Sequence, residues 1–561
     1  MALPLLLCLA FVPAIAHAMD KTMEAAAADA VEYAPANPDE KQDSSWPGQD
    51  TQEAPEEDAR FASIMEKAEK ASKEDYRSQK EQLPPFLSTL SLEQWQRVKF
   101  KPEYSLWRGE GLAFIARFFA PGSIFNRAVA INVIDGETVT RHNFSPAMFD
   151  FGNQLSDQDI KDVETDFAGF RLLQPARPPA GEEELATFIG ATFFRSKGRH
   201  SGYGVFARGL ALNLGEPEGE EFPYFSEFWL AKPRMGEESS TVYALLESPR
   251  MTGAYKFIIT PGASTVMDVS ARFFLRAPSD TPKKIGIAPM SSMFLFSESS
   301  LLPTDDYRPE VHNSDGLLFT SGETQWFWRP LNNPSRLSGQ QFSLTNPAGF
   351  GLMQRDADFD HYLDIDERFD RRASLWVEPK GNWGQGHIEL IEIPTRTDIN
   401  SNIHAFWVPK TQSKEDGSSI VPSSFRFDYR LYWMQPGVSP HLLGKVASTR
   451  FVRDVQNDSV RFIVDFEGES LKKLQADTGL SSIVDTPQDA PLLEKRLLKN
   501  PATGGWRLDF TVRVPKNDGV VQSIVSARDG SPPLRFRAML KKGENLPDPL
   551  TETWVFDLPT Q

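Results

Sequence analysis

Cysteine is almost absent from this chain of 561 residues, in which Cys8 is the only one. It lies in the opening segment MALPLLLCLAFVPAIAHA, where residues 3–15 are an apolar core and residues 16–18 (AHA) give the small-x-small pattern that signal peptidases cleave. We therefore predict a signal peptide over residues 1–18 and export to the periplasm, although no lysine or arginine precedes the apolar core. Cleavage would leave no thiol, which excludes disulfides and cysteine chemistry. A buried N-terminal helix is the weaker alternative, because the acidic stretch that follows offers it nothing to pack against.

Further long apolar runs and basic clusters are also missing. No other segment approaches the roughly 20 apolar residues that cross a bilayer, so we expect a chain that does not span the membrane. The formal net charge is −17, and residues 20–60 hold 12 acidic against 3 basic side chains. We predict that residues 19–60 are an acidic, disordered segment. The mildly acidic remainder excludes nucleic acid as a partner, because phosphate binding requires a clustered basic face.

Familiar catalytic and cofactor motifs are absent as well. The sequence has no Walker loop, no HExxH, no GxSxG elbow and no dinucleotide-binding glycine pattern after a strand, so we expect no cofactor. The nearest approach to a metal site is DADFDHYLDIDE (residues 356–367), whose acids match a calcium loop. His361 stands where a glycine allows the sharp turn of that loop. We predict no metal and interpret the segment as a solvated or cleft-lining acidic loop, with calcium binding as the alternative.

What the sequence does contain is a succession of short β-prone runs. Between residues 100 and 409 they are broken by Pro, Gly, Asn and Asp at intervals of about 8–15 residues. In VMDVSARFFLRA (266–277) the apolar residues alternate imperfectly, as in a sheet with one buried face. Residues 60–82 and 90–98 have helical spacing or a capping pattern. We predict an all-β fold in which residues 61–409 form a large β-sandwich or supersandwich led by a few short helices.

A second, smaller domain is predicted at the C-terminus. KTQSKEDGSSIVPSS (410–424) is polar and turn-rich, and is the best candidate for a linker. Residues 425–561 contain runs such as FRFDYRLYWM, RFIVDFEG and GWRLDFTVRVP, which suggest about seven strands. That size and rhythm is typical of an immunoglobulin-like sandwich.

Residues 307–334, YRPEVHNSDGLLFTSGETQWFWRPLNNP, are the richest in candidate functional groups. Their aromatics and polar groups suit a sugar-binding cleft, in which aromatic faces carry the rings and polar groups read the hydroxyls. Two tryptophans alternate along a predicted strand and face one side together, so they are either core or a sugar platform. The histidine is either a structural residue or a catalyst. The candidate substrate-binding residues in this stretch are Glu310, His312, Asp315, Trp326, Trp328 and Arg329.

Residues 372–395, RASLWVEPKGNWGQGHIELIEIPT, give two further candidates, Glu378 and Trp383. Glycines near them would permit close approach of a ligand. The alternative is a strand pair joined by a glycine-rich hairpin, with Trp376 in the core and Trp383 at a tip that points into solvent or a cleft. The sequence leaves both interpretations open.

Several long motifs resemble the periplasmic glucan biosynthesis protein G/D family. They include GATFFRSKGRHSGYGVFARGLALNLGEPEGEEFPYFSEFWL (190–230), IGIAPMSSMFLF (285–296), RPEVHNSDGL, WFWRPLNNP and SLWVEPKGNWGQG. The resemblance covers the chain from about residue 60 to its end. It implies a galactose-mutarotase-like β-supersandwich followed by an immunoglobulin-like domain. It also implies a periplasmic role in making osmoregulated periplasmic glucans, which have β-1,2-linked backbones and β-1,6 branches.

Some members of that family resemble inverting β-1,2-glucanases or transglycosylases, which need one carboxylic acid and one carboxylate. At the positions where the resemblance places the two catalytic aspartates, this sequence has Asn313, in EVHNSDG, and Ser401, in NSNI. Neither an amide nor an alcohol exchanges a proton usefully near neutral pH. Asp315 is a possible substitute.

Two hypotheses follow from this reading. The first is a glucan-binding accessory or scaffold protein that holds nascent β-1,2-glucan, with an inner-membrane glucan synthase as a possible partner. The second is a β-1,2-glucanase or transglycosylase that acts through relocated acids.

Overall fold

The computed structural model describes residues 30–32, 58–76, 83–152, 164–175, 181–276, 281–300, 305–322, 325–413, 419–475, 479–514, 534–543 and 549–558. The predicted signal peptide and most of the predicted acidic segment lie outside these residues. Within that segment, Ala30–Glu32 form strand β1 and Asp58 caps helix α1 (Ala59–Ser72), and the predicted disorder of the segment stays a prediction.

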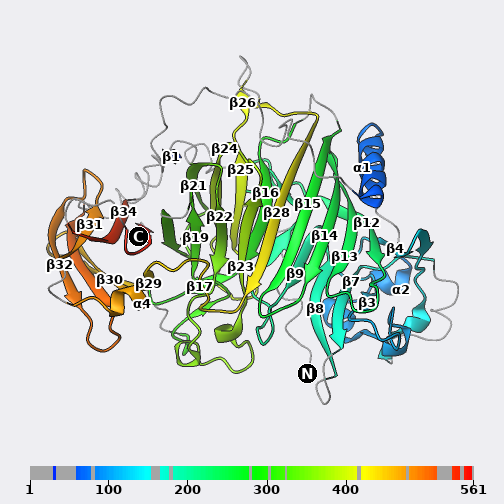
Figure 1. Cartoon of the computed structure of the whole chain (residues 1–561), viewed down its shortest axis with the longest axis horizontal. Helices are drawn as coiled ribbons and strands as arrows, with labels where there is room; N and C mark the ends of the chain where they lie inside the picture. Colours follow the sequence, from blue (N-terminus) through cyan, green and yellow to red (C-terminus); the bar gives the residue numbers. More distant parts are fainter. Residues whose placement is uncertain are drawn as a thin grey trace.

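Strands form two large sheets that lie face to face, which confirms the predicted all-β class (Figure 1). In the described residues the first sheet has 14 strands, in the order β31 (Leu480–Asp485), β34 (Arg535–Lys542), β35 (Thr553–Asp557), β20 (Trp326–Pro330), β19 (Gly316–Thr320), β22 (Gly349–Met353), β23 (Ser374–Lys380), β28 (Ser424–Met434), β15 (Thr265–Leu275), β14 (Met251–Thr260), β13 (Ser240–Glu247), β12 (Tyr224–Ala231), β4 (Ala130–Asp135) and β5 (Thr138–Arg141).

The second sheet has 11 strands as far as the described chain defines it. Their order is β1, β21 (Ser338–Thr345), β24 (Gln385–Glu392), β25 (Ile403–Pro409), β16 (Ile285–Ser292), β10 (Phe206–Arg208), β9 (Phe193–Ser196), β8 (Glu182–Ile189), β7 (Gly169–Pro175) and β3 (Ile115–Phe119), while β11 (Leu210–Leu212) also pairs with β16. Smaller pairs are β2 (Lys99–Phe100) with β6 (Phe149–Asp150), β17 (Phe294–Phe296) with β18 (Val311–His312), and β26 (Gln412–Ser413) with β27 (Ser419–Ile420).

Apolar side chains from both sheets fill the space between them. The Phe188 ring of β8 lies 5.3 Å from the Phe257 ring of β14, and the Phe319 ring of β19 lies 4.8 Å from the Phe342 ring of β21. The alternation noted at 266–277 is that of β15, whose residues from Met267 to Phe273 point alternately into this core and out of it. One face of the first sheet is therefore buried, and its outer face is left for other contacts.

Short helices precede the sandwich, as predicted. Helix α1 packs the apolar side chains of Phe61, Ile64 and Ala68 on the outer face of the first sheet, where Trp229 and Tyr243 lie. It ends at Ser72, ten residues before the predicted end. The predicted segment 90–98 is helix α3 (Leu92–Arg97), which Ser91 begins with a capping box, and α2 (Pro85–Ser88) comes before it. In the described part of the chain the 3-10 turns are η3 (Pro102–Tyr104), η4 (Pro146–Met148), η6 (Phe359–His361) and η7 (Phe369–Arg371).

Strand β28 corrects the predicted domain boundary. We assigned FRFDYRLYWM to the C-terminal domain because it follows the polar segment 410–424. Instead, β28 pairs with β15 on one side and β23 on the other, near the middle of the first sheet. Part of the predicted linker is the β26–β27 hairpin, through which the chain passes from the second sheet to the first. The large sandwich therefore extends to Met434.

The C-terminal strands form a second sandwich that shares a sheet with the first. Four of them pair in the order β29 (Lys445–Asp454), β30 (Ser459–Glu467), β33 (Trp506–Arg513) and β32 (Leu492–Lys499), and helix α4 (Glu469–Lys472) follows β30. Strands β31, β34 and β35 make the other layer and join the large sheet through parallel pairing of β35 with β20. Together they are the seven strands expected of an immunoglobulin-like sandwich, counted within the described residues.

Gly316 leaves room for the Trp328 ring between the large sheet and the C-terminal strands. A Cβ at Gly316 would lie 2.2 Å from that ring. We expect Gly316→Ala to lower the free energy of unfolding by about 1–3 kcal/mol through overpacking, as measured by urea denaturation. Gly339→Ala is the matched control, because a Cβ at that strand glycine would approach nothing closer than Glu389 Oε1 at 4.0 Å. Equal effects of the two substitutions would contradict this explanation.

Candidate functional site

The segments that carry Asn313 and Ser401 meet at one short strand, β17. The Asn313 N–H donates to the carbonyl of Met293 (2.8 Å). Asn402, which follows Ser401, donates from Nδ2 to the Phe294 carbonyl (2.9 Å) and accepts from the Phe294 N–H (2.9 Å). Asn313 and Asn402, the neighbour of Ser401, thus bond to the consecutive residues Met293 and Phe294 where β17 begins, although 88 positions separate Asn313 from Ser401 in the sequence.

Asn313 and Ser401 both carry buried polar atoms that no described protein group satisfies. Among the described residues, Asn313 Oδ1, Ser401 Oγ and Asn400 Oδ1 are buried and have no hydrogen-bond partner. Asn313 is only 7% exposed. Buried polar atoms of native proteins are almost always hydrogen-bonded, so this group of atoms has capacity for a hydroxyl-bearing ligand or for water.

Beside Asn313, three buried polar residues form a hydrogen-bonded chain. His312 Nε2 lies 2.9 Å from Glu310 Oε2, and His312 Nδ1 lies 2.8 Å from Gln354 Oε1. Burial alone would lower the pKa of His312, but the hydrogen bond and negative charge of Glu310 raise it to about 9. His312 is therefore an imidazolium near neutral pH that orients Glu310 and Gln354, and it is not free to act as a base.

Two carboxyl groups, Asp315 and Glu298, lie at one small cavity between the large sheet and the C-terminal strands. Its volume is about 20 Å³, close to the space of one water molecule. Asp315 Oδ2 accepts the backbone N–H groups of Arg355 (3.0 Å) and Asp356 (3.2 Å), while Asp315 Oδ1 is buried without a partner in the described part of the chain. Glu298 Oε1 accepts the N–H of Thr449 (3.0 Å).

Both carboxyl groups hold a proton more tightly than usual. Burial raises the pKa of Asp315 to about 6, against the opposing charges of His312 and Arg355. Burial and the negative charge of Glu310 raise the pKa of Glu298 to about 7. No sequence motif marks Glu298, which stands among serines in SESS, nine residues before the stretch that holds most of the other candidates.

The raised pKa of Glu298 predicts a pH-dependent gain of stability for Glu298→Gln. Because its folded pKa lies above the ordinary 4.5, Glu298 costs the native protein stability as pH rises from about 4.5 through about 7. Glutamine keeps the acceptor for Thr449 and does not ionise. We expect a higher urea midpoint than wild type at about pH 8 and no difference at about pH 4.

Glu552→Gln is the matched control for that experiment, with the opposite sign. Burial alone would raise the pKa of Glu552, but Arg355 and His441 lower it to about 2. Removing its charge should therefore destabilise the protein at about pH 8. A loss of stability in both variants at that pH would contradict the assignment for Glu298.

The two tryptophans of β20 face the C-terminal strands, and both are largely buried. Trp326 stacks on Trp376 (5.5 Å between centroids) and lies 4.5 Å from the His441 ring, so it belongs to the core. Trp328 lines the small cavity, and the Arg355 guanidinium lies 3.5 Å from its ring centroid. Of the two alternatives for this pair, the structure thus shows core packing, and neither ring is an open sugar platform.

Three other candidates lie away from Asn313. Arg329 is fully buried and binds Glu392 with both terminal nitrogens of its guanidinium (3.0 and 2.9 Å). Trp383 is 1% exposed and packs edge-on against Phe427, so the prediction that it points into solvent or a cleft is wrong. Glu378 accepts from the Tyr432 hydroxyl (2.9 Å) on the outer face of the first sheet.

Three loops meet around Arg308 and form a rim of the candidate site that the sequence did not reveal. The arginine's guanidinium donates to Asp306 (2.8 Å), Asp364 (3.0 Å) and Asp398 (2.9 Å), which come from three different loops. Each loop carries exposed apolar side chains next to these charges. They are Tyr307, Leu363, Ile365 and Ile399, with Tyr307 73% and Ile365 78% exposed. Asp398 and Ile399 lead directly into Ser401, so the rim adjoins the unsatisfied atoms described above.

The acidic segment 356–367 folds back on itself. In the described residues, Glu310, Asp356 and His361 place their potential ligand atoms within 4.8 Å of one another. His361 Nδ1 already lies 2.5 Å from Asp356 Oδ2, and Asp356 Oδ1 accepts the N–H of Asp358. Asp356 and His361 are thus engaged within the segment and Glu310 by His312, and our expectation of no metal stays a prediction.

The architecture defines an all-β protein of the two-sheet sandwich class. The chain matches the family described as "Periplasmic glucan biosynthesis protein, MdoG" over residues 60–558, and it belongs to this family. Relatives named "Glucans biosynthesis protein G", from Pseudomonas aeruginosa (strain LESB58) and Pseudomonas paraeruginosa (strain DSM 24068 / PA7), are each 38% identical over 509 residues, which is 88% of this chain and 92% of the relative. No helix within the described ranges is long and apolar enough to cross a membrane.

Proposed function

We propose that this protein acts in glucan biosynthesis in the periplasm, where it binds the β-1,2-linked backbone without cutting it. Family membership and the names of the relatives support the pathway and the compartment. An inner-membrane glucan synthase is the partner we propose to supply the chain.

Asn313 is the observation that carries this proposal. Asn313 directly follows His312 in the chain, at the position where the resemblance places a catalytic aspartate. A carboxamide has no proton-transfer step near neutral pH, whereas it donates and accepts hydrogen bonds to sugar hydroxyls. The unsatisfied oxygens of Asn313 and Ser401 and the exposed apolar rim around Tyr307 fit a ligand that is both hydroxyl-bearing and partly apolar.

A hydrolase or transglycosylase is the second candidate, because Glu298 and Asp315 have the raised pKa values expected of a general acid and base. Their shared cavity of about 20 Å³ argues against it. A glucose ring cannot enter a space of that size, so neither carboxyl can reach a glycosidic bond without separation of the C-terminal strands from the large sheet.

Calorimetric binding and reducing-end measurements on the same sample test the proposal. Mature protein should bind linear β-1,2-glucan and release no new reducing ends. Cleavage that is abolished by Asp315→Asn, and retained in the control Asp509→Asn, would overturn it. Asp509 suits this purpose because it pairs with Arg461 within the C-terminal four-stranded sheet.

A further inference from the structure

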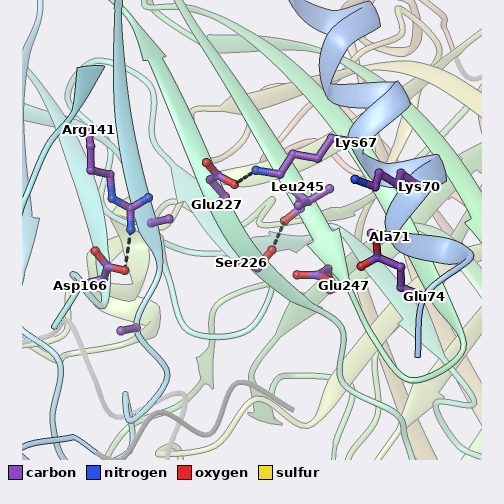
Figure 2. Close-up of a pocket in the computed structure, with 12 residues that line it drawn as sticks. Lys67, Lys70, Ala71, Glu74, Arg141, Asp166, Ser226, Glu227, Leu245 and Glu247 are labelled. Carbon is purple, nitrogen blue, oxygen red and sulfur yellow. Dashed lines mark hydrogen bonds and ion pairs between the residues drawn. The ribbon is translucent and has the colours of Figure 1, made fainter. Parts of the chain in front are cut away.

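A groove beside α1 lies apart from the candidate site. Its volume is about 400 Å³, within the range of about 300–1,000 Å³ that is typical of small-molecule sites. In Figure 2, Arg141 and Asp166 form one wall, Lys67 and Lys70 of α1 with Glu74 just after it form the other, and Ser226 lies between them. Small side chains, among them Ala71, Ala128 and Ala130, also line it.

The polar groups of this groove are held in place before any ligand arrives. Glu227 accepts from Asn132 (2.7 Å) and pairs with Lys67, whose ammonium lies 5.1 Å from the Trp229 ring centroid. Arg141 donates to Asp166 (2.6 Å) across the groove from them. Fixed donors and acceptors bind hydroxyls at a smaller entropic cost than mobile ones do.

Arg276 fixes the wall of the groove that α1 forms. Its guanidinium donates to the carbonyls of Ala71 and Glu74 at the end of α1, and also to Glu247, which lines the groove (3.2 Å). The end of α1 is therefore tied to β13 and β15, and the groove keeps its width.

The charges in the groove select the class of ligand. Three basic and four acidic side chains line it, so neither a phosphate nor a strongly cationic group finds a complementary field. Paired carboxylates and cations instead present acceptors and donors side by side, which matches a neutral, hydroxyl-rich ligand. We propose that this groove is a second carbohydrate-binding site that takes a short run of neutral sugar residues from the same glucan, an inference that rests on the proposed function.

The two sites are far enough apart to need a polymer to join them. Six strand spacings separate β22 from β12, and the groove and the candidate site lie toward opposite ends of the strands, so the separation is on the order of 40 Å. The outer face between them is polar, because Asp268 there binds Arg430 and Lys380. A short oligosaccharide would occupy the sites independently, while a long glucan could reach both and gain avidity.

Titration calorimetry with a linear β-1,2-linked pentasaccharide and with a long linear β-1,2-glucan tests the second site. Wild type should bind two equivalents of the pentasaccharide. Ser226→Trp, which fills the groove, should bind one, and its affinity for the long glucan should fall at least about tenfold. Glu66→Trp is the matched control on the exposed side of α1 and should behave as wild type. If Ser226→Trp does not fold, the double variant Lys70→Ala, Glu74→Ala replaces two exposed side chains of the groove. It should bind the second equivalent of pentasaccharide more weakly than wild type does.

The outcomes separate this inference from the proposed function. One equivalent in wild type, with long-glucan affinity unchanged in the groove variants, would overturn the second site and leave the proposed function standing. No binding of either glucan by wild type would overturn both.

Discussion

Changing Asn313 and Ser401 together to aspartate is expected to make the protein cleave linear β-1,2-glucan. The resemblance places a base and an acid at these positions, and each general acid or base contributes about 10²–10⁴-fold to the rate of a glycosidase. The structure supports the pairing, because the segments of both residues bond to the consecutive residues Met293 and Phe294 at the start of β17. We expect the double variant to release reducing ends at least about 100-fold faster than wild type.

Single variants and a neighbouring control make this result specific. Asn313→Asp or Ser401→Asp alone supplies one of two required groups, so each should stay near the wild-type rate. Asn400→Asp adds a carboxylate one residue from Ser401, in the bend before it, and should not replace it, because a catalytic carboxyl must lie within hydrogen-bond reach of the proton that it transfers. Wild-type cleavage as fast as that of the double variant would contradict the assignment of Asn313 and Ser401 as the missing pair.

Local sequence patterns predict those helices and strands whose structure depends only on residues close by in the chain. The alternation that revealed β15 depends only on which face is buried, and the capping box at Ser91 is local to α3. The partners of β28 could not be predicted in this way. A run such as FRFDYRLYWM fits any half-buried strand, and only the hydrogen bonds to β15 and β23 decide which domain contains it.

Only the part of the candidate site that lies in one short segment could be predicted from the sequence. Glu310, His312 and Asp315 lie within six residues, so a single motif revealed them. Glu298 meets Asp315 at the small cavity, and Arg308 meets Asp364 and Asp398 at the rim, through contacts between segments that only the folded chain brings together. Aromatic content misled the interpretation of Trp383, because a tryptophan beside glycines has the same sequence pattern in a core as in a cleft.

Arg329 is expected to contribute to stability, in contrast to the ligand-binding role we predicted from the sequence. It belongs to β20 of the first sheet, yet it binds Glu392 of β24 in the second sheet and lies 3.5 Å from Asp557 of β35. Arg329→Met would keep much of the apolar stem and leave Glu392 buried without its cation. Breaking a buried pair in this way costs about 3–5 kcal/mol of unfolding free energy.

The dependence on pH distinguishes this electrostatic loss from simple loss of packing. Burial already raises the pKa of Glu392, and the positive charge of Arg329 opposes that shift. Without Arg329 the folded pKa rises further above its ordinary value, so the penalty grows as pH increases and Glu392 must ionise. We expect the urea midpoint of Arg329→Met to fall more at about pH 8 than at about pH 5.

Two further variants complete the test. The double variant Arg329→Met, Glu392→Met should recover part of the loss, because it removes the uncompensated charge as well as the pair. Arg97→Met removes an exposed partner of Glu93 on α3 and should change stability little. A loss in Arg329→Met that is independent of pH and is not recovered by the double variant would show that packing of the Arg329 stem, and not its charge, holds the two sheets and β35 together.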